Sequence, residues 1–111
     1  MNTETERRRA PRYRLHQLVH LDMGREDFIP ADGLNISTTG LACLTDLAQD
    51  VGSRMFTMFQ LDPSSEESLV KCEGIVSRCD AKPNGEFEIG VEFTDILESD
   101  KRKIEEYLTQ A

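Results

Sequence analysis

The sequence predicts an all-β domain: a six-stranded antiparallel β-barrel followed by one C-terminal helix. Apolar and polar side chains alternate along several short segments, and turns that contain Gly, Pro, Asn or Asp separate these segments. Such a succession is typical of consecutive antiparallel strands in a small barrel. Only near the C-terminus does the spacing of apolar residues change to that of a helix.

The length of 111 residues fits one domain with a single hydrophobic core. We expect residues 1–6 to form a disordered tail and residues 7–111 one domain, in which 7–12 is an arm, 13–94 the barrel and 99–109 the helix. Hydrophobic residues make up 38% of the chain, and no apolar run approaches the about 18 residues of a membrane span. The N-terminus lacks the apolar segment of a secretory signal. These features predict a cytoplasmic protein without membrane insertion.

Positive charge is concentrated at the N-terminus of an otherwise acidic chain. The net charge is −8, yet residues 1–14 hold five arginines against two glutamates, a local charge of +3 that leaves −11 on the other 97 residues. Exposed charges interact over about 10 Å at moderate salt. A small anion at the arginines therefore experiences mainly the arginines, whereas the acidic remainder argues against a nucleic acid polymer as partner.

The first predicted strand covers residues 13–23. Most of its odd positions are apolar and most of its even positions polar, with Leu18 among the latter. His16 and His20 share the predicted polar face, but four strand residues span about 13 Å. We therefore expect two surface histidines and not a metal-binding pair.

The rest of the barrel follows from the same alternation and from turn residues. Residues 54–61 carry apolar side chains at both parities, so we expect this strand to be covered on both faces, with its Met and Phe side chains in the core. The predicted order is a turn at 24–27, a strand at 28–36 interrupted by Pro30 and Gly33, a strand at 41–44, a loop at 46–53, a strand at 54–61, a loop at 62–67, a strand at 68–79 bent at Gly74, a turn at 82–85 and a strand at 86–94.

A short polar motif lies at the end of the second predicted strand. Asn35 and Ser37 alternate with apolar neighbours, so both side chains project from one face of the strand. Gly40 permits a tight turn and a close approach of the backbone. Without further information this segment is equally well an ordinary Asx or Ser turn.

The C-terminal helix is predicted from a candidate N-cap residue and a stripe of apolar residues at helical spacing. Ser99 is a candidate N-cap, and Ile104, Tyr107 and Leu108 follow at helical spacing. We expect this stripe to lie on the barrel, over one open end, with residues 96–97 fixing the entry of the helix.

No catalytic or cofactor motif is present in the sequence. Cys43, Cys72 and Cys79 are odd in number and form no C-x-x-C pair, so we expect reduced, packed cysteines and neither a disulfide framework nor a zinc site. There is no phosphate-binding loop, no dinucleotide fingerprint and no H-E-x-x-H motif. Ser37 has no base partner that the sequence identifies. We therefore expect a binding protein, not an enzyme, and no cofactor.

Two distant motifs together resemble the signature of the PilZ family, whose members are bacterial receptors for cyclic di-GMP. The family pattern is Arg-Arg-x-x-x-Arg followed by Asp/Asn-x-Ser-x-x-Gly. The first half is met by Arg7, Arg8 and Arg12, and the second by Asn35, Ser37 and Gly40. Residues 74–76 and 89–93 also resemble later strands of the family, so the resemblance covers about residues 6–108. It implies a six-stranded, split-type barrel with a C-terminal helix.

The resemblance further implies a ligand and a mechanism. The arginines would hold the guanine edges and phosphates of cyclic di-GMP, Asn35 and Ser37 would contact a guanine, and Gly40 would shape the loop beneath it. We expect the arm to change conformation on binding and to alter the surface offered to an unidentified downstream protein. An arginine at position 7 accompanies a stacked pair of ligands in this family, which predicts two ligands per protomer. A monomer and a homodimer both remain open.

Two other functions compete with this interpretation. The first is a PilZ-like adaptor that acts through protein contacts without binding nucleotide, although the intact motif residues count against it. The second is a barrel that uses its basic arm for RNA or for an acidic partner. The acidic body and the lack of aromatic stacking residues on the predicted strand faces make RNA the weaker alternative.

Overall fold

The computed structural model describes residues 13–22, 25–62 and 65–109. This part of the chain forms one antiparallel sheet, in the order β2-β1-β5-β6-β7-β4-β3, and a C-terminal helix, α2. The predicted tail 1–6 and arm 7–12 lie outside the described residues. The elements are β1 (Arg14–Asp22), β2 (Arg25–Phe28), β3 (Ala31–Ile36), β4 (Gly40–Thr45), β5 (Arg54–Gln60), the 3₁₀ turn η1 (Glu66–Ser68), β6 (Leu69–Ala81), β7 (Phe87–Asp95) and α2 (Glu98–Thr109).

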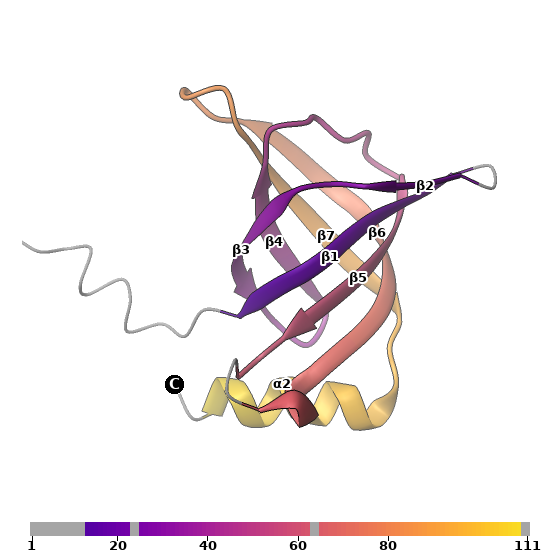
Figure 1. The fold of residues 1–111 in the computed structure, drawn as a ribbon, viewed down its shortest axis with the longest axis vertical. Coiled ribbons are helices and arrows are strands. Elements are labelled where there is room, and N and C mark those ends of the chain that lie inside the picture. Colours follow the sequence, from indigo (N-terminus) through magenta and orange to yellow (C-terminus); the bar gives the residue numbers. More distant parts are fainter. Residues whose placement is uncertain (1–12, 23–24, 63–64, 110–111) are drawn as a thin grey trace, which may run out of the picture.

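The sheet curls into a barrel (Figure 1). Its two edge strands, β2 and β3, are consecutive in the chain. The link between them is held to β1 by a hydrogen bond from the Ile29 N–H to the Leu18 carbonyl, 2.8 Å long. Helix α2 lies across one end of the barrel (Figure 1). The predicted fold class, an antiparallel barrel with a C-terminal helix, is confirmed, although the sheet of the described residues has seven strands where six were predicted.

The second predicted strand is divided in two. The polar residues 24–27 were expected to form a turn, but β2 begins at Arg25 and pairs with β1 as far as Phe28 opposite Val19. Pro30 has no N–H to give to a ladder, so the strand stops there and β3 starts at Ala31. Pairing with β1 therefore overrides the polar composition of this segment.

A β-bulge in β1 corrects the predicted faces of that strand. The register with β5 shifts between Leu15 and Gln17, so residues before and after the shift exchange faces. As a result Tyr13 and Leu18, at an odd and an even position, are both in the core, with 4% and 1% of their surfaces exposed. The prediction that placed Leu18 on the polar face is wrong.

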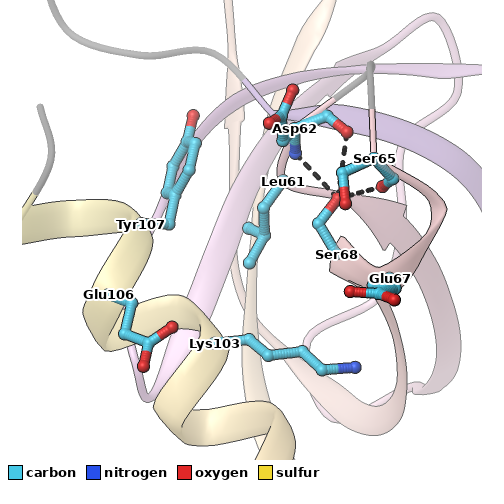
Figure 2. A pocket seen from close by; sticks show the side chains of 8 residues that line it. All are labelled: Leu61, Asp62, Ser65, Glu67, Ser68, Lys103, Glu106 and Tyr107. Atoms are coloured by element: carbon cyan, nitrogen blue, oxygen red, sulfur yellow. Dashed lines mark hydrogen bonds between the residues drawn. The ribbon is translucent and has the colours of Figure 1, made fainter.

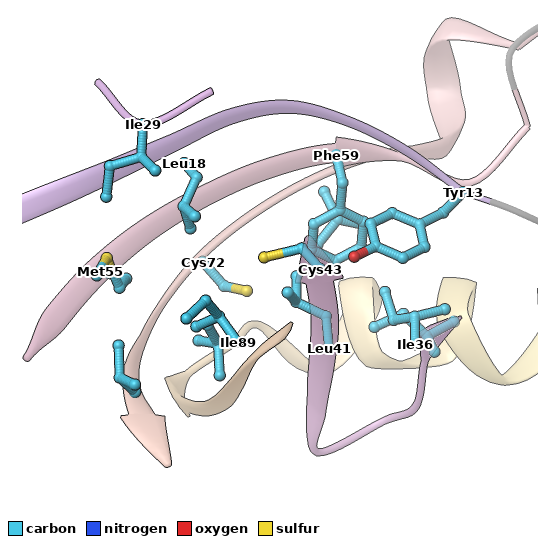
Figure 3. Packing of buried hydrophobic residues seen from close by; sticks show 14 of the residues in the cluster. Tyr13, Leu18, Ile29, Ile36, Leu41, Cys43, Met55, Phe59, Cys72 and Ile89 are labelled. Atoms are coloured by element: carbon cyan, nitrogen blue, oxygen red, sulfur yellow. The ribbon is translucent and has the colours of Figure 1, made fainter. Parts of the chain in front are cut away.

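The core is centred on Phe59 of β5, which is completely buried. Its ring meets the Tyr13 ring edge-on at 5.5 Å and stacks on the Phe93 ring at 6.0 Å, and Figure 3 shows it beside Tyr13 and Cys43. Along β5 buried residues alternate with half-buried ones such as Phe56 and Met58. The strand is thus fully covered on one face and only partly on the other, less than predicted.

The three cysteines are free thiols, as predicted. Cys43 and Cys72 are buried in the core, and Cys79 is partly exposed. Burial raises the pKa of Cys43 to about 12 and also raises the pKa of Cys72. Both buried thiols are therefore protonated at neutral pH and unreactive.

Helix α2 uses a narrower contact face than the sequence predicted. Ile104 is completely buried and Tyr107 packs on the core, but Leu108 is 40% exposed and Leu97 67% exposed. The contact face includes Asp100, 8% exposed, whose carboxylate lies 3.3 Å from the Lys103 ammonium.

Two details of the helix prediction are therefore wrong. Ser99 is not the N-cap, because α2 begins one residue earlier, at Glu98. Leu97 and Leu108 do not contribute to the packing expected of them. In the described part of the chain no helix has the length and apolar character needed to cross a membrane.

Candidate functional site

The polar motif of the second predicted strand forms the turn between β3 and β4. The Ser37 N–H donates to the Gly40 carbonyl over 2.8 Å and closes this turn. Asn35 and Ser37 are exposed while Ile36 between them is buried. The two polar side chains therefore share the outer face of the barrel, as predicted.

Hydroxyl groups order the turn from within. The Ser37 hydroxyl lies 3.1 Å from the Thr39 hydroxyl and accepts a hydrogen bond of 3.2 Å from the Thr39 N–H. The Thr39 carbonyl accepts a bond of 2.8 Å from the Phe93 N–H of β7. The Ser37 side chain is thus held in one position before any ligand arrives.

Gly40 is required by a close approach of two strands. It pairs with Glu92 of β7, and a Cβ atom at this position would collide with the Val91 carbonyl oxygen. Among the described glycines only Gly52 and Gly85 have a positive φ, so backbone freedom is not the reason for glycine here. The predicted close approach is confirmed, and its partner is β7.

These residues line one shallow hollow on the barrel surface, with a volume of about 300 Å³. Asn35, Ser37 and Gly40 form one side of it, and Arg78 of β6 and Glu92 of β7 form the other. Sequence reasoning did not find these last two residues, because they join the site through pairing between strands far apart in the chain. A Cβ on Gly90 would lie 2.8 Å from the Arg78 side chain, so glycine there makes room for the arginine, but only the structure shows this fit.

Arg78 is held by two carboxylates. One terminal nitrogen lies 2.7 Å from Asp80 and the other 2.9 Å from Glu88, which also binds Lys82 at 2.9 Å. The hydrogen bonds that Arg78 donates to Glu88 and Asp80 raise the pKa of Arg78, while Lys82 and Arg78 lower the pKa of Glu88. Because the side chains of Arg78, Asp80 and Lys82 are exposed and only that of Glu88 is mostly covered, the network contributes little stability and serves to orient the guanidinium group.

Arg7, Arg8 and Arg12 lie outside the described residues, but the residue that follows them is firmly placed. The Tyr13 hydroxyl donates to the Ala42 carbonyl over 2.8 Å, and a Cβ on Gly33 would lie 2.6 Å from the Tyr13 ring. Ala42 lines the hollow and pairs with Asn35. The arginine motif is therefore covalently attached to a residue anchored beside the polar motif.

A second cavity, of about 370 Å³, lies between α2 and the segment around η1 (Figure 2). In its wall the Ser68 hydroxyl is 2.7 Å from the Ser65 carbonyl, whereas the Tyr107 hydroxyl is buried without a hydrogen-bond partner among the described residues. None of the predicted site residues that the structure describes, Asn35, Ser37 and Gly40, lines it. The hollow at the β3–β4 turn is therefore the candidate site.

Fold and site together define a small β-barrel with a polar surface hollow at one hairpin. The family model of the PilZ domain matches residues 6–110, nearly the whole chain, and the chain belongs to the PilZ family. PilZ domains are receptor and adaptor domains.

One solved structure shows the same fold at low sequence identity. The structure of the Bacillus subtilis inhibitor of motility (MotI/DgrA) is 19% identical and superposes with a TM-score of 0.67. The match covers 86% of this chain and 46% of that protein, so the chain spans about half the length of this neighbour. No curated protein sequence matches the chain.

Proposed function

We propose that the protein is a receptor for cyclic di-GMP, which binds between the hollow at the β3–β4 turn and the arginines 7, 8 and 12. The observation that carries this proposal is the place of Tyr13, the residue that follows the arginine motif, beside the polar motif. Asn35, Ser37 and Gly40 line one hollow, and Tyr13, which follows the arginines in the chain, is bonded to Ala42 in the wall of the same hollow. Membership of the PilZ family supports it.

The chemistry of the residues suits this ligand. Cyclic di-GMP presents two phosphates and two guanines, whose O6 and N7 atoms match the planar donor fork of arginine. Each charge-assisted hydrogen bond contributes about 1.5–3 kcal/mol, so the loss of one arginine weakens binding about ten-fold or more. Asn35 and Ser37 provide short polar groups for one guanine, and Gly40 brings the turn close to β7.

Binding without catalysis is part of the proposal. The Ser37 hydroxyl contacts Thr39 and the Gly40 carbonyl, and neither group is a general base. We propose that the protein uses no cofactor and works in the bacterial cytoplasm, where it passes a signal to another protein.

We expect the signal to be a change in the conformation of the arm, residues 7–12. Ligand held against Asn35 and Ser37 would fix residues 7–12 and change the surface offered to a downstream protein. Amide hydrogen exchange in residues 5–14 is expected to slow at saturating ligand. Unchanged exchange there would exclude this mechanism even if the ligand binds.

The central test is a calorimetric titration with cyclic di-GMP, with GMP as the comparison ligand. We expect binding of cyclic di-GMP that is weakened about ten-fold or more in Arg8→Ala and Ser37→Ala, because each variant removes hydrogen bonds to the ligand. Arg54→Ala is the matched control, since Arg54 is exposed and lies outside the hollow. The role of Arg7 predicts a ratio of two ligands per protomer. A ratio near one would exclude the second ligand.

A negative titration would favour the adaptor. A ligand present at 100 times its dissociation constant stabilises the folded protein by about 2.7 kcal/mol, which a thermal denaturation detects. If the titration shows no heat of binding and the denaturation shows no thermal shift, the receptor proposal is overturned. The search would then turn to a protein partner. If RNA binds through the arm instead, excess cyclic di-GMP displaces it only when both use the same residues.

A further inference from the structure

We infer that Glu92 makes the site specific for guanine by accepting hydrogen bonds from the Watson–Crick edge of one base. This inference rests on the proposed function and assigns a role to a residue that belongs to neither sequence motif. It follows from the place of Glu92, from its lack of an ion-pair partner among the described residues and from the donor pattern of guanine.

Glu92 lies directly beside the polar motif. It is opposite Gly40 in the pairing of β4 with β7, and its exposed side chain lines the hollow together with Asn35 and Ser37. Among the described residues that line this hollow, Glu92 is the one carboxylate. A base that touches Asn35 and Ser37 is therefore within reach of this side chain.

The carboxylate of Glu92 has no ion-pair partner in the described part of the chain. Arg78 lines the same hollow, but Asp80 and Glu88 hold its two terminal nitrogens at 2.7 Å and 2.9 Å. The oxygens of Glu92 remain available for a ligand. An unpaired carboxylate at the binding site of a dianion is unfavourable unless the ligand gives it hydrogen-bond donors.

Guanine offers such donors side by side. Its N1–H and its exocyclic N2 amino group point in the same direction, and the two oxygens of a carboxylate accept both. Adenine presents an unprotonated N1 at the corresponding position, which would face the carboxylate with a lone pair. The Asn35 amide has a single carbonyl oxygen and cannot supply both acceptors. Glu92 therefore supplies the acceptor pair that distinguishes guanine.

The test compares three cyclic dinucleotides on three proteins. Wild type, Glu92→Gln and Glu92→Ala are titrated with cyclic di-GMP, with its inosine analogue, which lacks the N2 amino group, and with cyclic di-AMP. Wild type is expected to prefer the guanine ligand over the inosine ligand about ten-fold, as one hydrogen bond to a charged group implies. In Glu92→Ala this preference is expected to fall to about two-fold or less, with Glu92→Gln between the two.

The control and the outcomes separate this inference from the proposed function. Glu73→Gln removes an exposed β6 carboxylate outside the hollow and is expected to keep the wild-type preference. If wild type binds none of the three ligands, the proposed function fails and this inference fails with it. If wild type binds but the Glu92 variants keep its preference for guanine, the inference alone is overturned. The same holds if the variants bind all three ligands more tightly by the same factor, which would mean that Glu92 only repels the phosphates.

Discussion

Replacing Phe59 by alanine is expected to lower the free energy of unfolding by about 3–5 kcal/mol, the usual cost of emptying a large aromatic site in a core. The Phe59 side chain is completely buried and contacts the Tyr13 and Phe93 rings at 5.5 Å and 6.0 Å. Its loss removes both ring contacts and leaves a cavity in the middle of the barrel. Urea denaturation followed by circular dichroism measures the change.

The matched control is Phe56→Ala, on the same strand. Phe56 is half-buried on the opposite face of β5, so the same deletion removes less buried surface and creates no internal cavity. We expect a clearly smaller loss of stability. Equal losses in the two variants would show that the barrel interior does not dominate the stability of this fold.

The second large effect is a loss of stability at alkaline pH. Burial raises the pKa of Cys43 from its ordinary value of 9.0 to about 12, and it raises the pKa of Cys72 and of Tyr13. The unfolded chain releases these protons at lower pH than the folded protein does, so the stabilisation is complete below about pH 9 and is lost as the pH rises towards 12. For Cys43 alone the loss is on the order of 4 kcal/mol, since one pKa unit corresponds to about 1.4 kcal/mol.

Urea midpoints measured between pH 8 and pH 11 test this expectation, and substitutions assign it. In Cys43→Ala the decline of the midpoint with pH is expected to be shallower than in wild type. Cys79→Ala changes a partly exposed cysteine and should leave the decline unchanged. A decline of the same steepness in all three proteins would assign the alkaline transition to other groups.

The fold could be predicted largely because most of its strands show a local alternation of apolar and polar residues. In β7 the alternation places Ile89 and Val91 inside and Glu92 outside, and the structure has the same arrangement. The bulge in β1 could not be predicted, because it depends on how that strand pairs with β5 far along the chain. Residues 25–27 of β2 were missed for a similar reason: they are polar, and pairing with β1 alone makes them part of a strand.

The residues of the candidate site likewise fall into some that local sequence predicts and some that only strand pairing brings together. Asn35, Ser37 and Gly40 are close in sequence and could be found as a motif, whereas Arg78 and Glu92 reach the hollow through pairing of β6 with β7 and of β7 with β4. No local pattern around Arg78 or Glu92 distinguishes them from other charged strand residues. The arginines 7, 8 and 12 lie outside the described residues, and their role stays a prediction.

Under the proposed function, the anchoring of Tyr13 would make the meeting of the two motifs an intramolecular event. Arg8 is five residues from Tyr13, so its Cα lies within about 18 Å of the Tyr13 Cα whatever path the chain takes. Groups joined by so short a link experience effective concentrations in the millimolar range. Under the proposed function the arginines would thus reach the hollow at an effective concentration that dilution of the protein does not change. Occupancy of the site would then follow the level of free ligand alone, which is the behaviour required of a sensor in cells that contain few copies of it.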